Sequence, residues 1–210
     1  MIQTDATRAK IFFENSHRNA AFGEARKQLL QKIAQKITDV YIANNGSVSI
    51  NFICTHNSRR SQLGQVWTFF AAHYFDLNIT SYSGGTEVTA FHRNTVRTLK
   101  EVGFTFDIEE FSHQNPIYQV SFEGTDDSIL GFSKTFDHSI NQSPYIAITT
   151  CDSADQNCPY IAEAIARFHL PYKDPKASDN TPEQAASYLK TNQEVASEMY
   201  FIFKLVKSSL

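Results

Sequence analysis

The chain has 210 residues, of which 41% are hydrophobic and 20% are charged, and its formal net charge at pH 7 is -3. This length and composition predict one soluble α/β domain with an added segment, and the chain is long enough to bury a core of useful size. The small negative charge gives no reason to expect nucleic acid as a partner, and no apolar run approaches the ~20 residues of a membrane span. The polar start MIQTDATRAK lacks the apolar core of a signal peptide, which favours a cytoplasmic location.

The cysteines are few and widely spaced: Cys54, Cys151 and Cys158. Three cysteines in a chain of this length do not make the disulfide framework of a secreted domain. In a reducing compartment such thiols are either reactive or simply buried, and their positions relative to the other elements must decide between the two.

Residues 1–46 precede the first predicted strand. Apolar residues recur at steps of three and four between Phe22 and Tyr41, which predicts an amphipathic helix ending at Asn44-Asn45-Gly46. The prediction therefore divides the chain into an N-terminal helical extension, 1–46, and a main domain, 47–210. The simplest role of the extension is to pack on the main domain, and the alternative is to bind a partner.

The stretch INFICTHNSRRSQLGQVW, residues 50–67, predicts a buried strand, a short polar loop and a helix in direct succession. Such a loop points backbone N–H groups into one concavity and the helix N-terminus adds partial positive charge, so an anion can bind there. The same donors favour the nucleophilic thiolate of Cys54. Arg60 can bind two oxygens of a tetrahedral oxyanion. Asn57 can hold the loop by bonding its own backbone, and Ser61 can cap the helix or donate to the thiolate.

The sequence of residues 54–61, Cys-Thr-His-Asn-Ser-Arg-Arg-Ser, resembles the Cys-x5-Arg-Ser signature of two families that share one fold. These are the low-molecular-weight protein tyrosine phosphatases and the thioredoxin-linked arsenate reductases. The resemblance implies a three-layer α/β/α fold with a four-stranded parallel sheet. It also implies that the oxyanion is bound by Thr55, His56, Asn57, Ser58, Arg59, Arg60 and Ser61.

Two positions of this loop depart from the pattern of the families. Arg59 stands where both often carry another cysteine, which adds positive charge to the loop. His56 replaces the glycine usual in the arsenate reductases, and its side chain is expected either to crowd the pocket or to tune Cys54.

The middle of the chain predicts a strand at 78–83, broken by Gly84-Gly85, and then a helix at 94–102. Residues 105–143 have no single period and predict an insertion, either a hairpin or a lid over the site. A further buried strand is predicted at 144–150. Because ligands of open α/β sheets bind at the carboxyl ends of the strands, Cys151 should lie at the same sheet edge as Cys54.

The segment ITTCDSADQNCP carries Cys151 and Cys158 seven positions apart. A polar, movable loop is predicted between them, followed by a helix that begins at Pro159. One face of that helix would carry Ile161, Ala164, Ile165 and Phe168. The segment resembles the part of the thioredoxin-linked arsenate reductases that holds their second and third redox cysteines, a pair that the tyrosine phosphatases lack. The alternative is that both thiols are buried and inert.

The end of the chain contains Asp174-Pro175 within HLPYKDPKAS. This pair resembles the loop of both families whose aspartate is the general acid, although Asp-Pro is also a common turn. The sequence Thr181-Pro182-Glu183 then predicts the start of the final helix, with Thr181 as its cap.

The resemblance implies reduction of arsenate to arsenite, with no metal or organic cofactor and with thioredoxin as the electron donor. Cys54 would form a thiol-arsenate intermediate, Arg60 would hold the oxyanion and Asp174 would donate a proton. Cys151 and Cys158 would then carry the oxidation away as disulfides. Two alternatives stay open: a tyrosine phosphatase that forms a phosphocysteine at Cys54, and a non-catalytic module that binds oxyanions.

Overall fold

The computed structural model describes residues 7–157 and 160–210. Its first half contains α1 (Arg8–Arg18), α2 (Glu24–Ala43), β1 (Val48–Cys54), α3 (Arg60–Tyr74), β2 (Ile79–Gly85), α4 (Arg93–Glu101) and β3 (Phe104–Glu110). Its second half contains β4 (Ile117–Phe122), β5 (Ile129–Gly131), β6 (Tyr145–Thr149), α5 (Asp152–Asn157), β7 (Ala164–His169), the 3₁₀ helix η1 (Pro175–Ser178) and α6 (Gln184–Ser208).

The central sheet has four parallel strands in the order β2-β1-β6-β7. Its register aligns apolar residues of neighbouring strands on one face, as in the pairs Ile50 with Ile146 and Phe52 with Ile148. β1 and β6 are buried along nearly their whole length, as expected of strands in a parallel sheet covered on both faces. The predicted four-stranded α/β fold is confirmed.

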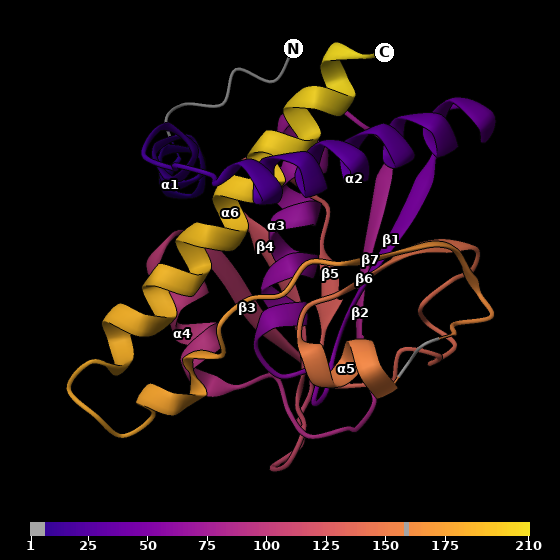
Figure 1. Ribbon diagram of the computed structural model, residues 1–210. Coiled ribbons are helices and arrows are strands. Elements are labelled where there is room, and N and C mark those ends of the chain that lie inside the picture. Colours follow the sequence, from indigo (N-terminus) through magenta and orange to yellow (C-terminus); the bar gives the residue numbers. More distant parts are fainter. Residues whose placement is uncertain (1–6, 158–159) are drawn as a thin grey trace.

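Helices α2 and α3 pack against the face of the sheet that carries Ile50 and Phe52, and α6 packs on both helices. α3 lies so close to β1 that a Cβ at Gly64 would stand 2.4 Å from the Phe52 ring, so only glycine fits there. The opposite face has a smaller core, which includes Ile53, Ala147 and Ala154 of α5. In Figure 1, α5 lies at the bottom of the sheet, where β1 and β6 end.

The predicted helix after Pro159 is wrong. Residues 164–169 form β7, which pairs in parallel with β6, and a short helix, α5, occupies the segment predicted as a loop between the cysteines. Pro159 itself lies outside the described residues. The apolar pattern covers only six residues, which is too few to distinguish a helix from a strand. The edge of β6 offers backbone hydrogen-bond partners, and these favour the strand.

The predicted insertion forms a separate antiparallel sheet of order β3-β4-β5. Its hairpin, β3 with β4, agrees with one of the two predicted alternatives. The chain after β5 returns to the parallel sheet, where Thr135 forms a bridge with Gly85. The prediction that Gly84-Gly85 breaks the strand is wrong. Both glycines belong to β2 and pair with the end of β1.

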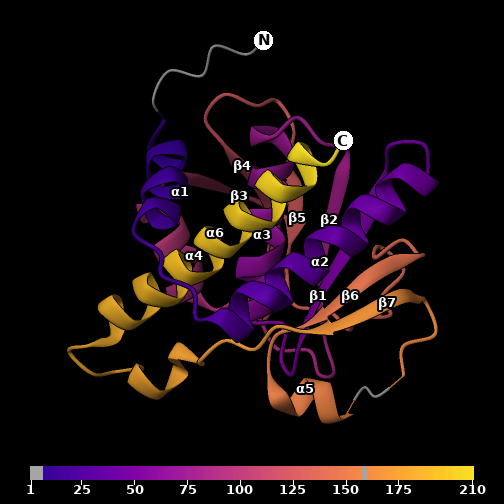
Figure 2. The same ribbon diagram turned by 45° about the horizontal axis from the view of Figure 1, so that its top comes forward.

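The N-terminal segment contains two helices, of which only α2 was predicted. α1 and α2 flank α6 (Figure 2), and Phe13 of α1 stacks on Trp67 of α3 with ring centroids 5.5 Å apart. These residues belong to one apolar core with the sheet. No helix within 7–157 and 160–210 has the length and apolarity needed to cross a membrane.

The final helix starts later than predicted. α6 begins at Gln184 and its N-cap is Glu183, whereas the Thr181 hydroxyl donates to the carbonyl of Ser178 at 2.9 Å. Thr181 therefore closes the turn after η1 and does not cap α6, because the preceding short helix takes its hydroxyl as a partner.

Candidate active site

The end of β1 and the start of α3 place Cys54 and Ser61 side by side. Cys54 is 3% exposed, and its Sγ lies 3.1 Å from the Ser61 Oγ. The Asn57 amide donates to that same Oγ at 2.9 Å. Because Ser61 accepts this bond, its own hydroxyl hydrogen is free to point at the sulfur, which stabilises a thiolate. Of the two predicted roles for Ser61, the geometry favours donation to Cys54.

Residues 54–61, which we call the anion loop, are held by Asn57. Its φ of +46° lies in the left-handed region, which Asn tolerates better than most residues. The side-chain oxygen Oδ1 of Asn57 accepts from the backbone N–H of Lys134 at 2.9 Å. The prediction that Asn57 bonds its own backbone is therefore wrong. Gly85 lies directly against this loop, since a Cβ there would stand 2.7 Å from the Thr55 oxygen and 2.8 Å from the Asn57 nitrogen.

Arg60 and Asp174 meet although they are 114 positions apart in the chain. Arg60 Nη2 donates to Asp174 Oδ2 at 2.8 Å, and Nη1 donates to the Tyr172 carbonyl at 3.3 Å. Arg60 Nε is buried and has no partner within the part of the chain that the structure describes, so this donor is available to an oxyanion. Asp174 is fixed in turn because it caps η1, accepting from the Lys176 N–H at 3.0 Å.

Arg59 turns away from the anion loop. Its Nε donates to the Tyr188 hydroxyl at 2.7 Å, and its Nη2 donates to Asp179 at 2.9 Å. Burial alone would raise the pKa of Asp179, but the hydrogen bond from Tyr188 and the charge of Arg59 outweigh it and hold that pKa below its usual range. Burial, with the bond to Asp179, raises the pKa of Tyr188 to about 12. The Arg59 side chain thus ties the start of α3 to α6 and adds no charge inside the loop.

Replacing Arg59 with methionine should therefore lower the stability of the fold. Two buried charge-assisted bonds are lost and Asp179 loses its cation, so the free energy of unfolding should fall by about 2–3 kcal/mol in urea denaturation. The matched control is Arg97→Met, because the Arg97 pair with Glu101 is exposed and should change stability by no more than about 0.5 kcal/mol. Equal effects of the two variants would contradict this role of Arg59.

The remaining loop residues are held mainly through their backbone. The carbonyl of His56 accepts from the hydroxyls of Thr89 and Ser133, while its ring lies at the surface, 3.4 Å from Glu87. The predicted crowding of the pocket by His56 is therefore not seen. The Ser58 carbonyl accepts from the His92 N–H at 3.0 Å.

Cys151 reaches the anion loop from the neighbouring strand. Its Sγ lies 3.5 Å from the Thr55 Oγ1, and its side chain is 4% exposed. The N–H of Thr150 donates to the carbonyl of Ile53 at 2.7 Å, which holds the ends of β1 and β6 together. Cys54 and Cys151 belong to one apolar cluster at this edge of the sheet. Cys158 lies outside the described residues.

The helix after Cys151 is held by ionic contacts with β6 and β7. Asp155 pairs with Arg167 and accepts from the Thr149 hydroxyl, while Asp152 lies 3.0 Å from His169. The segment predicted as movable is thus an ordered helix, α5, docked on the strand beside it.

Three further residues that contact the site were not predicted. The segment after β5 lies behind the anion loop: Gln62 donates to the Phe132 carbonyl at 2.8 Å, and Lys134 holds Asn57. The backbone carbonyl of Tyr172 accepts a hydrogen bond from Arg60. The only sequence signal for any of them is the Gln that follows Ser61, because the others act through backbone atoms or lie in the aperiodic insertion.

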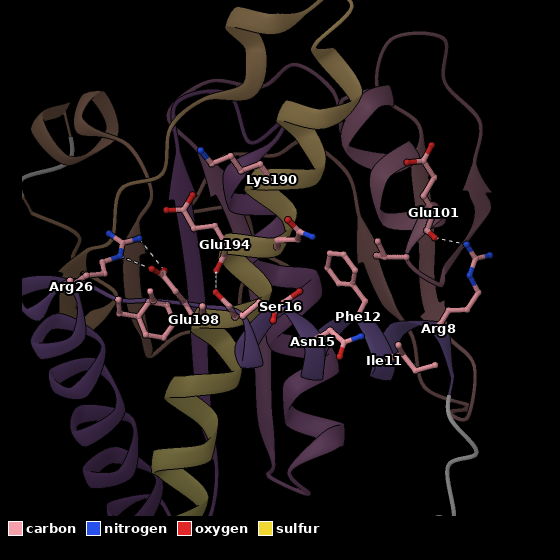
Figure 3. Close-up of a pocket in the computed structure, with 18 of the residues that line it drawn as sticks. Arg8, Ile11, Phe12, Asn15, Ser16, Arg26, Glu101, Lys190, Glu194 and Glu198 are labelled. Atoms are coloured by element: carbon pink, nitrogen blue, oxygen red, sulfur yellow. Dashed lines mark hydrogen bonds and ion pairs between the residues drawn. The ribbon is translucent and has the colours of Figure 1, made fainter.

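A large hollow of about 830 Å³ lies elsewhere, between α1, α2 and α6 (Figure 3). It contains neither cysteine of the site. At its wall Arg26 binds Glu198 through two bonds of 2.6 and 3.0 Å, and Glu198 accepts from the Tyr172 hydroxyl at 2.7 Å. Glu198 thus connects the wall of the hollow to Tyr172, the residue whose carbonyl accepts from Arg60. Among the residues described, no cluster of three or more His, Cys, Asp or Glu side chains is arranged to bind a metal.

Comparisons with known proteins place the fold and the sequence. No protein-family model matches the chain. A Bacillus subtilis arsenate reductase is 28% identical over 151 residues, which are 71% of this chain and 91% of the relative. A Staphylococcus aureus arsenate reductase is 29% identical over 127 residues, 60% of this chain and 78% of the relative. The crystal structure of a YwlE mutant from B. subtilis has a TM-score of 0.51 at 16% identity and covers 75% of this chain and 97% of that one.

The four-stranded parallel sheet gives this chain the fold of that solved structure. In sequence the chain is a homologue of the arsenate reductases. The predicted resemblance to the arsenate reductases, which are enzymes, is confirmed by these relatives.

Proposed function

We propose that this protein reduces arsenate to arsenite with Cys54 as the nucleophile. The observation that carries the proposal is the position of Cys151, whose sulfur contacts the anion loop. A phosphatase that works through a phosphocysteine does not need this second thiol. The names of the sequence relatives agree with the proposal.

In the first step the Cys54 thiolate attacks arsenic while Arg60 and the loop N–H groups bind the arsenate oxygens. One oxygen leaves as water after Asp174 supplies its proton. The Arg60–Asp174 contact of 2.8 Å supports these two roles, because it keeps the proton donor, Asp174, beside Arg60, which binds the oxyanion. The product is a covalent Cys54 thiol-arsenate.

In the second step the Cys151 thiolate attacks the Cys54 sulfur. The electron pair of the S–As bond passes to arsenic, As(V) becomes As(III), and arsenite leaves a Cys54–Cys151 disulfide. Neighbouring strands lie about 4.8 Å apart, within the range of Cα separations that a disulfide spans, about 4.4–6.8 Å. β1 and β6 are such neighbours, and from their last pair, Ile53 with Thr149, Cys54 is one residue further along and Cys151 is two.

In the third step Cys158 attacks the Cys151 sulfur, which frees Cys54 and leaves a Cys151–Cys158 disulfide. A dithiol protein of the thioredoxin class, the proposed partner, then reduces this disulfide in a reducing, cytoplasmic setting. The two electrons come from thiols throughout, so the reaction calls on no metal or organic cofactor. Release of α5 from Arg167 and His169 would allow the segment that holds both cysteines to move.

The residues proposed for the first step can also hydrolyse phosphate esters. Phosphate and arsenate have the same shape and charge, so Cys54, Arg60 and Asp174 would also support a phosphocysteine route. We therefore expect a side activity on aryl phosphates. A purely non-catalytic module is disfavoured because it has no use for a cysteine, an arginine and an aspartate gathered at one loop.

The proposal is tested with the reduced, full-length protein, arsenate and a thioredoxin system, with arsenite measured by chromatography coupled to mass spectrometry. We expect arsenite to form in the wild type and not in Cys54→Ser. Hydrolysis of para-nitrophenyl phosphate is measured beside it. Ester hydrolysis that depends on Cys54 without any arsenite would replace the proposed function by a phosphatase.

The role of Asp174 predicts a dependence on the leaving group. Replacing Asp174 with asparagine should lower kcat for phenyl phosphate by about 10²-fold or more, because the poor leaving group needs a proton. The loss with para-nitrophenyl phosphate should be clearly smaller. The control Asp107→Asn, at an exposed position of β3, should leave both rates unchanged. Equal losses with the two esters would show that Asp174 positions Arg60 and does not act as the acid.

A further inference from the structure

Lys134 is a buried lysine whose amine has neither a hydrogen-bond nor an ion-pair partner among the residues described. Its side chain is 2% exposed. The Nζ lies over the ring of Phe132, 4.6 Å from the ring centroid. A buried amine of this kind costs stability, so its retention calls for an explanation.

The backbone around Lys134 forms the rear wall of the anion loop. The N–H of Lys134 donates to the Asn57 side chain, and its carbonyl accepts from the N–H of Gly85 at 2.8 Å. The Ser133 hydroxyl donates to the His56 carbonyl at 2.9 Å. Asn57 in turn holds Ser61 against the Cys54 sulfur. One chain of contacts therefore leads from Lys134 to the nucleophile.

We propose that Lys134 is the counter-charge of the anion loop: its amine stays neutral while the loop is free and takes up a proton from solvent when a dianionic oxyanion binds in front of it. Lys134 is thus a positioning residue that acts on the oxyanion through the loop without touching it. This inference rests on the oxyanion site proposed above.

Burial explains why the amine can change its charge in this way. It lowers the pKa of Lys134 to about 7, because a buried ammonium loses its hydration and no carboxylate replaces it. The charged and titratable side chains of the surrounding segments are Cys54, Arg60, His56 with Glu87, and His138, whose ring packs on Phe132. None of them forms an ion pair with Lys134 within the described residues.

A dianion on the other side of the loop changes this balance. The two negative charges of the oxyanion favour the charged form of a nearby buried amine and so raise its pKa. At pH 8 the lysine then changes from mostly neutral to mostly charged. Binding of the dianion and of the proton are linked, so each strengthens the other.

The test uses tungstate, a tetrahedral dianion that does not titrate near neutral pH, and the full-length Cys54→Ser protein, in which the thiol no longer titrates. Calorimetric titrations at pH 8 in Tris and in HEPES give the number of protons taken up for each tungstate bound. We expect roughly half a proton or more with Lys134 present. When Lys134→Met is combined with Cys54→Ser, the proton uptake should fall by that amount. When the control Lys32→Met, at an exposed position of α2, is combined with Cys54→Ser, the proton uptake should not change.

The affinity for tungstate gives a second readout. Lys134→Met should weaken binding several-fold at pH 8 and more than about tenfold at pH 6, where the lysine is charged more fully in the complex. Equal uptake and equal affinity with and without Lys134 would overturn the inference. So would an uptake below about 0.2 proton in the protein that keeps Lys134, a result that needs no folded variant. If the protein with Lys134 does not bind tungstate at all, the oxyanion site itself fails and the inference fails with it.

Discussion

Cys151→Ser should abolish arsenate reduction and spare the hydrolysis of phosphate esters. The serine hydroxyl cannot attack the Cys54 sulfur, so arsenite release should fall by on the order of 10³-fold or more. The aryl phosphate reaction uses Cys54, Arg60 and Asp174 alone, so its kcat should stay within about threefold of the wild type. Steady-state rates of both reactions, measured on one preparation, check this separation.

The control for this experiment is Cys54→Ser, which should lose both activities. Two outcomes would contradict the proposed role of Cys151. Arsenate reduction at the wild-type rate would show that another thiol attacks Cys54. Loss of ester hydrolysis in Cys151→Ser would show that Cys151 supports the anion loop through Thr55 and is not a redox partner.

Lys134→Met should make the protein more stable, and the gain should shrink as the pH rises. Because the folded-state pKa of Lys134, about 7, lies below the ordinary lysine value of 10.5, the unfolded chain binds more protons between these two values. Below pH 7 both states are charged and the folded state bears the full cost of the buried ammonium. This cost declines as the pH rises from about 7 to 10.5.

The difference in unfolding free energy between Lys134→Met and the wild type should therefore be largest at pH 6, on the order of 4 kcal/mol. Above pH 7 it should shrink by about 1.4 kcal/mol for each pH unit. Urea denaturation at several pH values between 6 and 9.5 measures this, with Lys32→Met as the control that should show no such trend. A difference that does not change with pH would mean that Lys134 does not titrate in this range.

The sequence predicted the parts of the fold that depend on strong local patterns. The strand, loop and helix at residues 50–67 combine a buried apolar run, a polar loop and helical spacing, and the structure has all three in the expected order. The placement of Cys151 at the same edge as Cys54 followed from a general property of parallel sheets.

The sequence failed where backbone pairing or distant contacts decide the outcome. β7 has apolar residues at helical spacing, and only the open edge of β6 makes it a strand. Arg59 sits inside the signature, so its sequence position suggests an anion ligand, but Tyr188 and Asp179, which take its side chain, are more than a hundred residues away. Lys134 lies in an aperiodic segment, and no local pattern indicates that its amine is buried behind the loop.

The central claim is that Cys54 and Cys151 supply the two electrons that reduce arsenate and are left joined as a disulfide, which Cys158 then resolves. The most direct measurement is disulfide mapping by mass spectrometry after a single addition of arsenate to the fully reduced protein, with phosphate as the control anion. We predict a Cys151–Cys158 disulfide that forms with arsenate and not with phosphate, and a trapped Cys54–Cys151 disulfide in Cys158→Ser. Three cysteines that remain reduced after arsenate treatment would contradict this account.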